Sequence, residues 1–342
     1  MKVGIIGSGG REHALCHAIK NSEKVDKIYC IPGNAGTYEI AENVNLDINN
    51  FELLKLFIIQ NNIDIVINFA AMTDPAQCEN DPKRAFAVNS EAVEKLFKSA
   101  TVAGCKKFIQ ISTSHVYGTS SKEKKFNVND TCLPNTVYGK SKYQAEKRLI
   151  SLAEKHKINL SIIRVFSIIS SKMRDGYLYK NLVNRAKNKD YSAINGLNSV
   201  RDFIHAQDAM AMVMRVAKTD NNPTILNACS GTGTSIRELA KRVYLQYGAD
   251  PYKIENFSDE TPFGDYLVGE PSKTILDLIR KQDRPFKMFH NIYNFGSLLL
   301  HRVTLGLFPK SLIGFGLIGL MGYCTHFSVL FLTNYFIDDF YI

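Results

Sequence analysis

The stretch KVGIIGSGGREHALCHAIKN, residues 2–21, places a strand, a glycine-rich turn and a helical pattern in direct succession. Its strand at 2–6 carries consecutive apolar residues, as expected of a strand that is buried on both faces. The turn exposes backbone N–H groups at the start of a helix, where they attract phosphate. This unit predicts a nucleotide-binding α/β fold in which Gly7, Gly9 and Gly10 are cofactor-binding residues.

The same alternation of strands and helices continues along the chain. Further strands are expected at 27–31, 64–69, 107–112, 160–166 and 224–228, and helices at 11–21, 50–62, 81–104, 141–157 and 235–248. Strands that alternate with helices form βαβ units, and these units build a parallel sheet. We therefore expect an α/β protein with a Rossmann-like, doubly wound parallel sheet. The complete predicted fold also has a smaller substrate lobe and a C-terminal transmembrane helix.

Composition excludes several classes of protein. The 342 residues include 42 Lys and Arg against 33 Asp and Glu, which gives a net charge of +9 and favours anionic partners. An aromatic content of 11% and a charged content of 22% exclude wholesale disorder. The seven cysteines form no C-x-x-C pair and no metal-like spacing with histidine, so we expect reduced thiols and no metal.

The C-terminal region differs from the rest of the chain. Residues 311–337 contain no Asp, Glu, Lys or Arg, and a membrane span needs about 20 apolar residues. Residues 290–342 resemble the start of a GtrA-like membrane module. Arg302 and Lys310 precede the segment, Asp338 and Asp339 follow it, and a basic joint lies at 280–287. The positive-inside rule then predicts a membrane partner through 311–337 and a location at the cytoplasmic face of the inner membrane. The alternative is a buried core helix in a soluble cytoplasmic protein.

The glycine turn departs from the usual dinucleotide pattern at its third glycine. His13 stands there in the G-x-x-G-x-x-G spacing, and Glu12 stands there in the G-x-G-x-x-G spacing. The pieces GSGGREHAL, PGNAGT and AENVNLDINNFELLKLFIIQNNIDIVI resemble the opening of phosphoribosylamine–glycine ligase over residues 1–67. In that family this segment is only the subdomain that precedes the ATP-grasp domain. No such domain follows here, so ligase activity is not expected.

A second resemblance begins at Asn68. Its pieces are NFAA (68–71), AFAVNS (85–90), STSHVYG (112–118), YGKSK (138–142), RDFIHAQDA (201–209) and LNACSG (226–231). In this order they resemble the extended short-chain dehydrogenase/reductases, the NAD-dependent epimerase/dehydratase group, over about 68–275. The resemblance implies NAD or NADP as the cofactor and a nucleotide-sugar substrate.

The YGKSK piece carries the chemistry. Tyr138 and Lys142 are four residues apart, so they share one face of a helix. A phenol titrates at about 10, and a nearby ammonium lowers that pKa. Tyr138 can then exchange a proton with a sugar oxygen as hydride moves to or from nicotinamide. The resemblance places Lys142 on the nicotinamide ribose as well, and implies that the Thr113 hydroxyl hydrogen-bonds the reacting oxygen.

The resemblance also implies the remaining cofactor contacts. Ala70 and Ala71 follow the strand at 64–69, where small residues let a cofactor lie against the backbone. Asn89 matches the asparagine that the family carries on the next helix. Asp47 matches an acid that contacts adenine, although the ligase-like segment would also supply it.

Substrate contacts are expected at Arg201 and Ser114. In nucleotide-sugar members the arginine at the start of RDFIH holds the diphosphate, which suits a guanidinium fork. Ser114 and His115 stand where 4,6-dehydratases have Asp-Glu, so dehydration is disfavoured. His115 is either an additional proton donor or a packing histidine. Ser167 replaces the asparagine of many epimerases.

Three resemblances with joints near 67 and 285 indicate a chimera. We expect a nucleotide-binding domain at 1–165, ligase-like to 67 and epimerase-like from 68, then a substrate-binding lobe at 166–285 and a basic joint with the membrane segment at 286–342. The predicted function is an NAD(P)-dependent epimerase or reductase that acts on a nucleotide-linked sugar. The alternative is a catalytically silent fusion with weak or no cofactor binding. Nucleic acid is not an expected partner, and a homodimer is left open.

Overall fold

A large parallel sheet forms the centre of the described structure. The computed structural model describes residues 1–271 except 21, 157, 171–172, 174, 219–224 and 259–263, and these residues belong to one compact unit, Met1–Ser272. The sheet has seven strands in the order β10-β7-β5-β4-β1-β2-β3, and every neighbouring pair is parallel. Its strands are β1 (Lys2–Gly7), β2 (Lys27–Pro32), β3 (Glu42–Asn43), β4 (Ile65–Asn68), β5 (Lys107–Thr113), β7 (Asn159–Val165) and β10 (Ile225–Ala228).

The order of the strands shows where a ligand site is expected. The chain starts at β1, moves outward to β2 and β3, and then returns to β4 on the other side of β1. In doubly wound sheets, ligands bind outside the carboxyl ends of the strands at such a reversal. The strands expected at 2–6, 64–69 and 107–112 lie together in this sheet, so the Rossmann-like prediction is confirmed.

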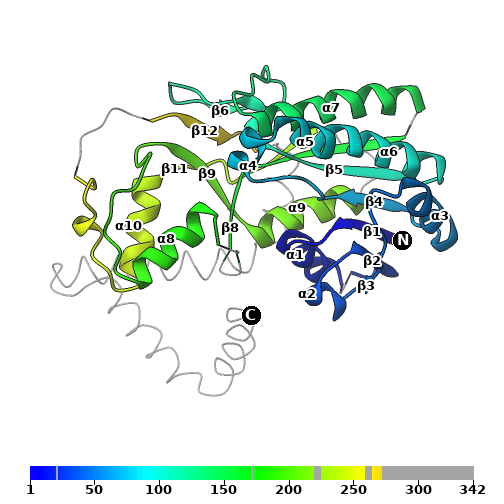
Figure 1. The fold of residues 1–342 in the computed structure, drawn as a ribbon, viewed down its shortest axis with the longest axis horizontal. Coiled ribbons are helices and arrows are strands. Elements are labelled where there is room, and N and C mark those ends of the chain that lie inside the picture. Colours follow the sequence, from blue (N-terminus) through cyan, green and yellow to red (C-terminus); the bar gives the residue numbers. More distant parts are fainter. Residues whose placement is uncertain are drawn as a thin grey trace, which may run out of the picture. The chain divides into compact units, whose positions relative to one another are not determined.

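Helices cover both faces of the sheet (Figure 1). On one face lie α3 (Phe51–Asn61), α6 (Ala92–Val102) and α7 (Val137–His156), and on the other α1 (Gly10–Ile19) packs against α9 (Ala206–Lys218). Phe97 of α6 meets Phe108 of β5 edge-on, with ring centroids 5.1 Å apart, inside a fully buried apolar cluster. Burial of such side chains is the main force that holds helix against sheet.

The helix expected over 81–104 consists of three pieces. These are α5 (Pro82–Phe86), a π-helical segment (Ala87–Glu91) and α6, and a short helix α4 (Pro75–Asn80) precedes them. Asp74 and Asp81 accept hydrogen bonds from backbone N–H groups at the starts of α4 and α5, which explains the breaks. The π-helical segment carries the buried Asn89, and such segments are frequent at functional sites.

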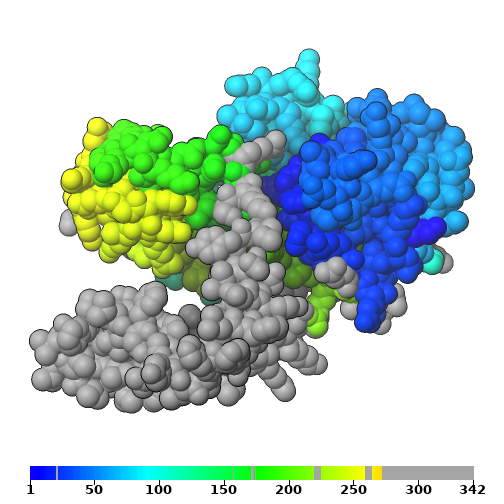
Figure 2. Space-filling view, turned by 90° about the horizontal axis from the view of Figure 1, so that it is seen from below, coloured from blue at the N-terminus to red at the C-terminus, as the bar shows by residue number. Residues whose placement is uncertain are grey.

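A smaller lobe has its own sheet and core. Its strands are β6 (Lys125–Phe126), β8 (Ser167–Ile169), β9 (Val200–His205), β11 (Gly233–Ser235) and β12 (Tyr266–Gly269), in the order β11-β9-β12-β6 with β8 beside β9. Helices α8 (Leu178–Lys187) and α10 (Ile236–Gln246) form its core around the fully buried Tyr244. Figure 2 shows the N-terminal residues in blue and lobe residues in green and yellow. Between the lobe segments, α9 and β10 return to the large sheet.

The predicted membrane segment at 311–337 lies outside the described residues, as does the basic joint at 280–287. Among the helices that the structure describes, none combines the length and the apolar character that a membrane span requires.

Candidate functional site

Helix α7 holds the predicted acid–base pair at the carboxyl end of β5. Gly139, which lies between the two residues, is needed because a side chain there would come within 2.5 Å of the carbonyl oxygen of His115. That oxygen belongs to a 3₁₀ turn (Ser114–Tyr117) that directly follows β5. The close approach therefore brings the start of α7 onto the end of β5.

The structure brings Thr113, Tyr138 and Lys142 together. Tyr138 is 8% exposed; burial raises the pKa of its phenol, while the positive charge of Arg11 and a hydrogen bond with Thr113 lower it. Lys142 is 2% exposed, and its Nζ donates a hydrogen bond to the carbonyl oxygen of Ile111 at 2.7 Å. Burial lowers the pKa of Lys142 to about 8, although the negative charge of Glu146 acts in the opposite direction. The ammonium is therefore charged at neutral pH but close to its titration range.

A buried ion pair that sequence reasoning missed lies one helical turn beyond Lys142. Glu146 of α7 pairs with Arg164 of β7 at 2.7 Å, and their side chains are 1% and 3% exposed. Ser112 donates its hydroxyl to the same carboxylate at 2.5 Å, and Arg164 also donates to the Tyr117 hydroxyl at 2.9 Å. An arginine inside the apolar run LSIIRVF was the signal, because a buried guanidinium requires a partner.

Asn89 connects the loop after β4 with α7. Its side-chain oxygen accepts a hydrogen bond from the Met72 N–H at 2.8 Å, and its amide donates to the Met72 carbonyl at 3.0 Å and to Ser141 Oγ at 3.1 Å. The loop that Asn89 holds contains Ala70 and Ala71, which are half-buried. The Asn89 side chain therefore hydrogen-bonds the loop backbone and fixes the position of the loop.

The glycine turn is shaped by Glu12. Gly7 has φ +138°, and a side chain at this position would lie 1.9 Å from Oε1 of Glu12. A side chain at Gly9 would lie 3.0 Å from Oε2 of the same carboxylate, whereas Gly10 has no atom within 4 Å of that position. The His13 ring lies over Gly36 of the short helix α2 (Ala35–Tyr38), where a side chain would meet the ring at 3.0 Å.

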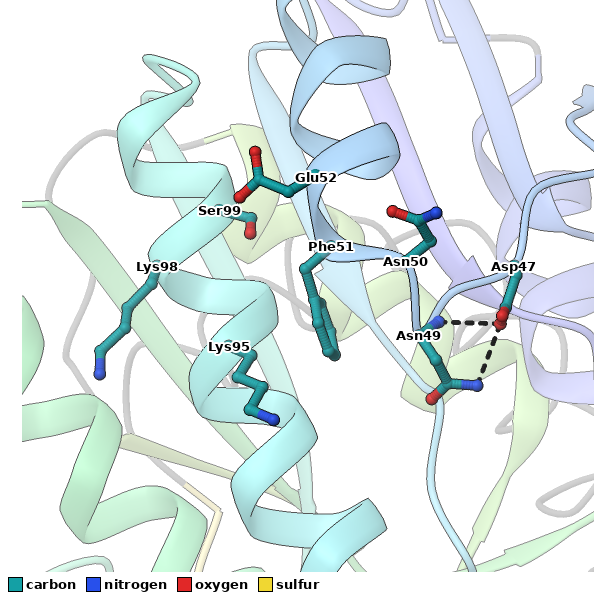
Figure 3. A pocket seen from close by; sticks show the side chains of 8 residues that line it. All are labelled: Asp47, Asn49, Asn50, Phe51, Glu52, Lys95, Lys98 and Ser99. Atoms are coloured by element: carbon teal, nitrogen blue, oxygen red, sulfur yellow. Dashed lines mark hydrogen bonds between the residues drawn. The ribbon is translucent and has the colours of Figure 1, made fainter.

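Asp47 lies in a surface pocket of about 640 Å³ at the start of α3 and beside α6 (Figure 3). Its carboxylate accepts hydrogen bonds from the backbone N–H and the side-chain amide of Asn49, at 2.9 and 3.0 Å. Phe51 lies within the pocket between Asp47 and the two lysines, Lys95 and Lys98. The adenine contact predicted for Asp47 remains a prediction.

The predicted substrate residues lie near Tyr138 and in the lobe. Ser114 is buried in the 3₁₀ turn, and the His115 ring meets the Tyr138 ring edge-on at 5.6 Å. Burial and the charge of Arg201 lower the pKa of His115, so the imidazole is neutral at pH 7. Arg201 Nη2 donates to both carboxylate oxygens of Asp265 at 3.0 Å. The diphosphate role of Arg201 and the substrate contact of Ser114 remain predictions.

The residues around Tyr138 fit the nicotinamide end of a dinucleotide more clearly than the glycine turn fits its diphosphate. The linked Thr113 hydroxyl and Tyr138 phenol, and the Lys142 ammonium on the Ile111 carbonyl, are groups that could hold nicotinamide and its ribose. At the turn, open space exists at Gly10, while the Glu12 carboxylate lies against Gly7 and Gly9. Within the described part of the chain, no cluster of three His, Cys, Asp or Glu residues could hold a metal ion.

Comparison with known proteins identifies the family. The family model described as "NAD dependent epimerase/dehydratase family" matches residues 5–229, which is more than half of the chain. The chain belongs to this NAD-dependent family. The prediction of NAD or NADP as the cofactor is thereby confirmed at the level of the family.

Individual relatives agree with this assignment. A dTDP-D-glucose 4,6-dehydratase of Bos taurus is 27% identical over 281 residues, which are 80% of this chain and 75% of that protein. The UDP-glucose 4-epimerase of Thermotoga maritima, solved with UDP-glucose, has a TM-score of 0.66 at 19% identity and covers 79% of this chain and 86% of its own. This second likeness shows the fold.

The ligase-like resemblance of the N-terminal segment is also confirmed. The phosphoribosylamine–glycine ligase of Caldanaerobacter subterraneus subsp. tengcongensis is 54% identical over 67 residues. These residues are 20% of this chain, and the chain spans only 16% of the length of that ligase. The match therefore concerns one segment within a member of the epimerase/dehydratase family.

Proposed function

We propose that this protein is an NAD(P)-dependent epimerase or reductase that acts on a nucleotide-linked sugar through proton transfer by Tyr138. The observation that carries the proposal is the placement of Tyr138 against Thr113, and of Lys142 against Ile111, at the carboxyl end of β5. This arrangement occurs in a member of an NAD-dependent family. It supplies a proton donor, a hydroxyl partner and a positive charge at one place.

The side chains have separate tasks in this mechanism. Nicotinamide supplies or accepts hydride when it is bound. Tyr138 gives its phenolic proton to a sugar carbonyl oxygen, or removes the proton of a sugar hydroxyl, and the Thr113 hydroxyl keeps that oxygen in line. The charge of Arg11 and the hydrogen bond with Thr113 favour the phenolate, which burial alone would disfavour. Water exclusion at the 8% exposed phenol strengthens these charge effects.

The sugar nucleotide is proposed from the relatives and from the basic residues of the site. One relative acts on dTDP-D-glucose, and a structural neighbour holds UDP-glucose. Arg201 would bind the diphosphate after exchanging one contact with Asp265, and Ser114 would contact the sugar. Ser114 and His115 offer no carboxylate beside Tyr138 for the removal of water, which favours epimerisation or reduction over dehydration.

Product analysis tests the proposal. The full chain would be incubated with UDP-glucose or dTDP-glucose and NAD, and with 4-keto sugar nucleotides and NADH or NADPH. Conversion to a ring epimer identifies an epimerase, and oxidation of the reduced cofactor with formation of a 4-hydroxy sugar nucleotide from the 4-keto sugar identifies a reductase. A protein that binds the cofactor but converts none of these sugars would contradict the proposal.

A silent fusion is the second candidate. The observation that favours it is the ligase-like segment with Glu12 in the glycine turn. Denaturation of the purified protein, followed by chromatography of the released nucleotides, separates the two candidates. Bound nicotinamide dinucleotide supports the enzyme, and a protein that carries none and takes up none supports the silent fusion.

Membrane attachment through 311–337 is proposed from the absence of charged residues alone. The full chain should sediment with membranes and resist alkaline carbonate. Arg302 and Lys310, which precede the segment, favour the cytoplasmic face of the inner membrane for the catalytic domain. Release by carbonate would favour the alternative of a core helix. The same preparation, in detergent, shows by light scattering whether the protein is a homodimer.

A further inference from the structure

Two of the three glycines in the turn, Gly7 and Gly9, leave room for the side chain of Glu12. A side chain at Gly7 would lie 1.9 Å from one oxygen of Glu12, and a side chain at Gly9 would lie 3.0 Å from the other. Contacts below 3.0 Å do not occur between real atoms of this kind, so Gly7 must be a glycine while Glu12 keeps its position. In a dinucleotide fold the corresponding glycines allow the backbone to approach the pyrophosphate.

Glu12 is a buried residue, and no other side chain pairs with its carboxylate in the part of the chain that the structure describes. The residue is 5% exposed, and its carboxylate forms neither a hydrogen bond nor an ion pair there. It lies in the first turn of α1, where the helix dipole favours a negative charge. The same backbone N–H groups and the same dipole would attract a phosphate.

We propose that Glu12 competes with the diphosphate of the cofactor for the glycine turn and thereby sets the affinity for the dinucleotide. The diphosphate of NAD carries negative charge, so it cannot lie beside the Glu12 carboxylate without repulsion in this buried place. Binding requires the Glu12 side chain to rotate away from Gly7 and Gly9. Gly10, which has open space around it, is the part of the turn that stays accessible.

This inference rests on the proposed function, because it assumes that a dinucleotide enters the site. Its test compares ligands with and without the diphosphate. Calorimetry would measure the binding of NAD, ADP-ribose and adenosine to the full chain, to Glu12→Gln and to Glu12→Ala. Glu238→Gln is the matched control, because Glu238 also lies in the first turn of a helix, α10, but in the lobe.

We expect Glu12→Gln to lower the Kd for NAD and ADP-ribose by about tenfold or more, since it removes the charge and keeps the shape. Adenosine, which has no diphosphate, should bind all the proteins equally, and Glu238→Gln should behave as the wild type. Glu12→Ala should show the same gain as Glu12→Gln, which identifies the charge as the cause.

Two results would overturn the inference. If the wild type binds NAD and neither Glu12 variant binds it more tightly, Glu12 does not compete with the diphosphate, while the proposed function stands. If all the proteins are folded by circular dichroism but none binds NAD, removal of the carboxylate does not open the turn. That second result also removes the proposed function.

Discussion

The catalytic region, formed by Thr113, Tyr138 and Lys142, and the glycine turn, residues 7–13, both lie at carboxyl ends of strands in the same sheet. In the predicted catalytic region Tyr138 is linked to Thr113, Lys142 donates to the Ile111 carbonyl of the same strand, and burial shifts the pKa values of Tyr138 and Lys142. In the turn the backbone has the expected strand–turn–helix course, but Glu12 occupies space beside the glycines. A motif therefore predicts the course of the backbone more securely than it predicts which group fills the space around it.

The largest effect should come from the catalytic region. Tyr138→Phe removes the proton-transfer group and keeps the ring, so turnover of a sugar nucleotide should fall by about 10²–10⁴-fold. Tyr143→Phe is the matched control, because Tyr143 lies on the same helix but outside the catalytic region. Steady-state rates measure both. Equal rates for Tyr138→Phe and the wild type would assign the acid–base role to another residue.

The next largest effect should come from the buried ion pair between Glu146 and Arg164. Glu146→Gln leaves the buried Arg164 without its carboxylate, and loss of one partner of a buried pair costs about 3–5 kcal/mol of unfolding free energy. Glu94→Gln, at an ion pair nearer the surface of α6, should cost at most about 1 kcal/mol. Urea denaturation measures both variants. Similar losses for the two variants would mean that the buried Glu146–Arg164 pair contributes no more to stability than the pair nearer the surface.

Lys142 should reduce stability at neutral pH. Its pKa is about 8 in the folded protein against 10.5 for the free group, so the folded state binds fewer protons between these values. Stability therefore rises with pH through this window, and the penalty of a buried charge is present below pH 8. Lys142→Met should be more stable than the wild type at pH 7, by at most about 3 kcal/mol.

Unfolding free energies of the wild type and Lys142→Met at pH 7 and near pH 10.5 test this. The difference between the two proteins should shrink at the higher pH, because the wild type then folds with a neutral amine. A difference that does not change with pH would mean that Lys142 is not desolvated.

The smallest effect should come from His13 in the glycine turn. The ring packs over Gly36 and takes the place of the third glycine, so His13→Gly should strengthen NAD binding. The gain should be smaller than that of Glu12→Gln, because no charge is removed. Calorimetry at fixed salt measures it, with His17→Gly as the control on the same helix. A loss of affinity would mean that the ring supports the turn.

Much of the large sheet could be predicted from local pattern, because each buried strand is a short apolar run between helical segments. Helix α9 was not predicted, although the run AQDAMAMVMRVAK carries a buried face. Its first residues overlap the motif RDFIHAQDA, which hides the start of the helical pattern. The short strands of the lobe were missed because two to six residues of mixed polarity give no clear period.

The site was predictable where it rested on spacing along one helix, as for Tyr138 and Lys142. It was not predictable where partners come from distant parts of the chain. Arg201 meets Asp265, which is 64 residues further along, and nothing local to either residue indicates the pair. The absence of a third glycine was visible in the sequence, but the position of the Glu12 carboxylate depends on the fold of the turn.

Transfer of a hydrogen isotope tests the central claim most directly. A UDP- or dTDP-sugar that carries deuterium on the ring carbon to be oxidised would be mixed with an equimolar amount of the full chain and NAD. Because an epimerase returns the deuteride to the sugar, the reaction would be stopped within one turnover and the nicotinamide analysed by mass spectrometry. We predict deuterium on the nicotinamide of the wild type and a transfer about 10²–10⁴-fold slower in Tyr138→Phe. NAD binding without deuterium transfer from any of these sugars would contradict the account.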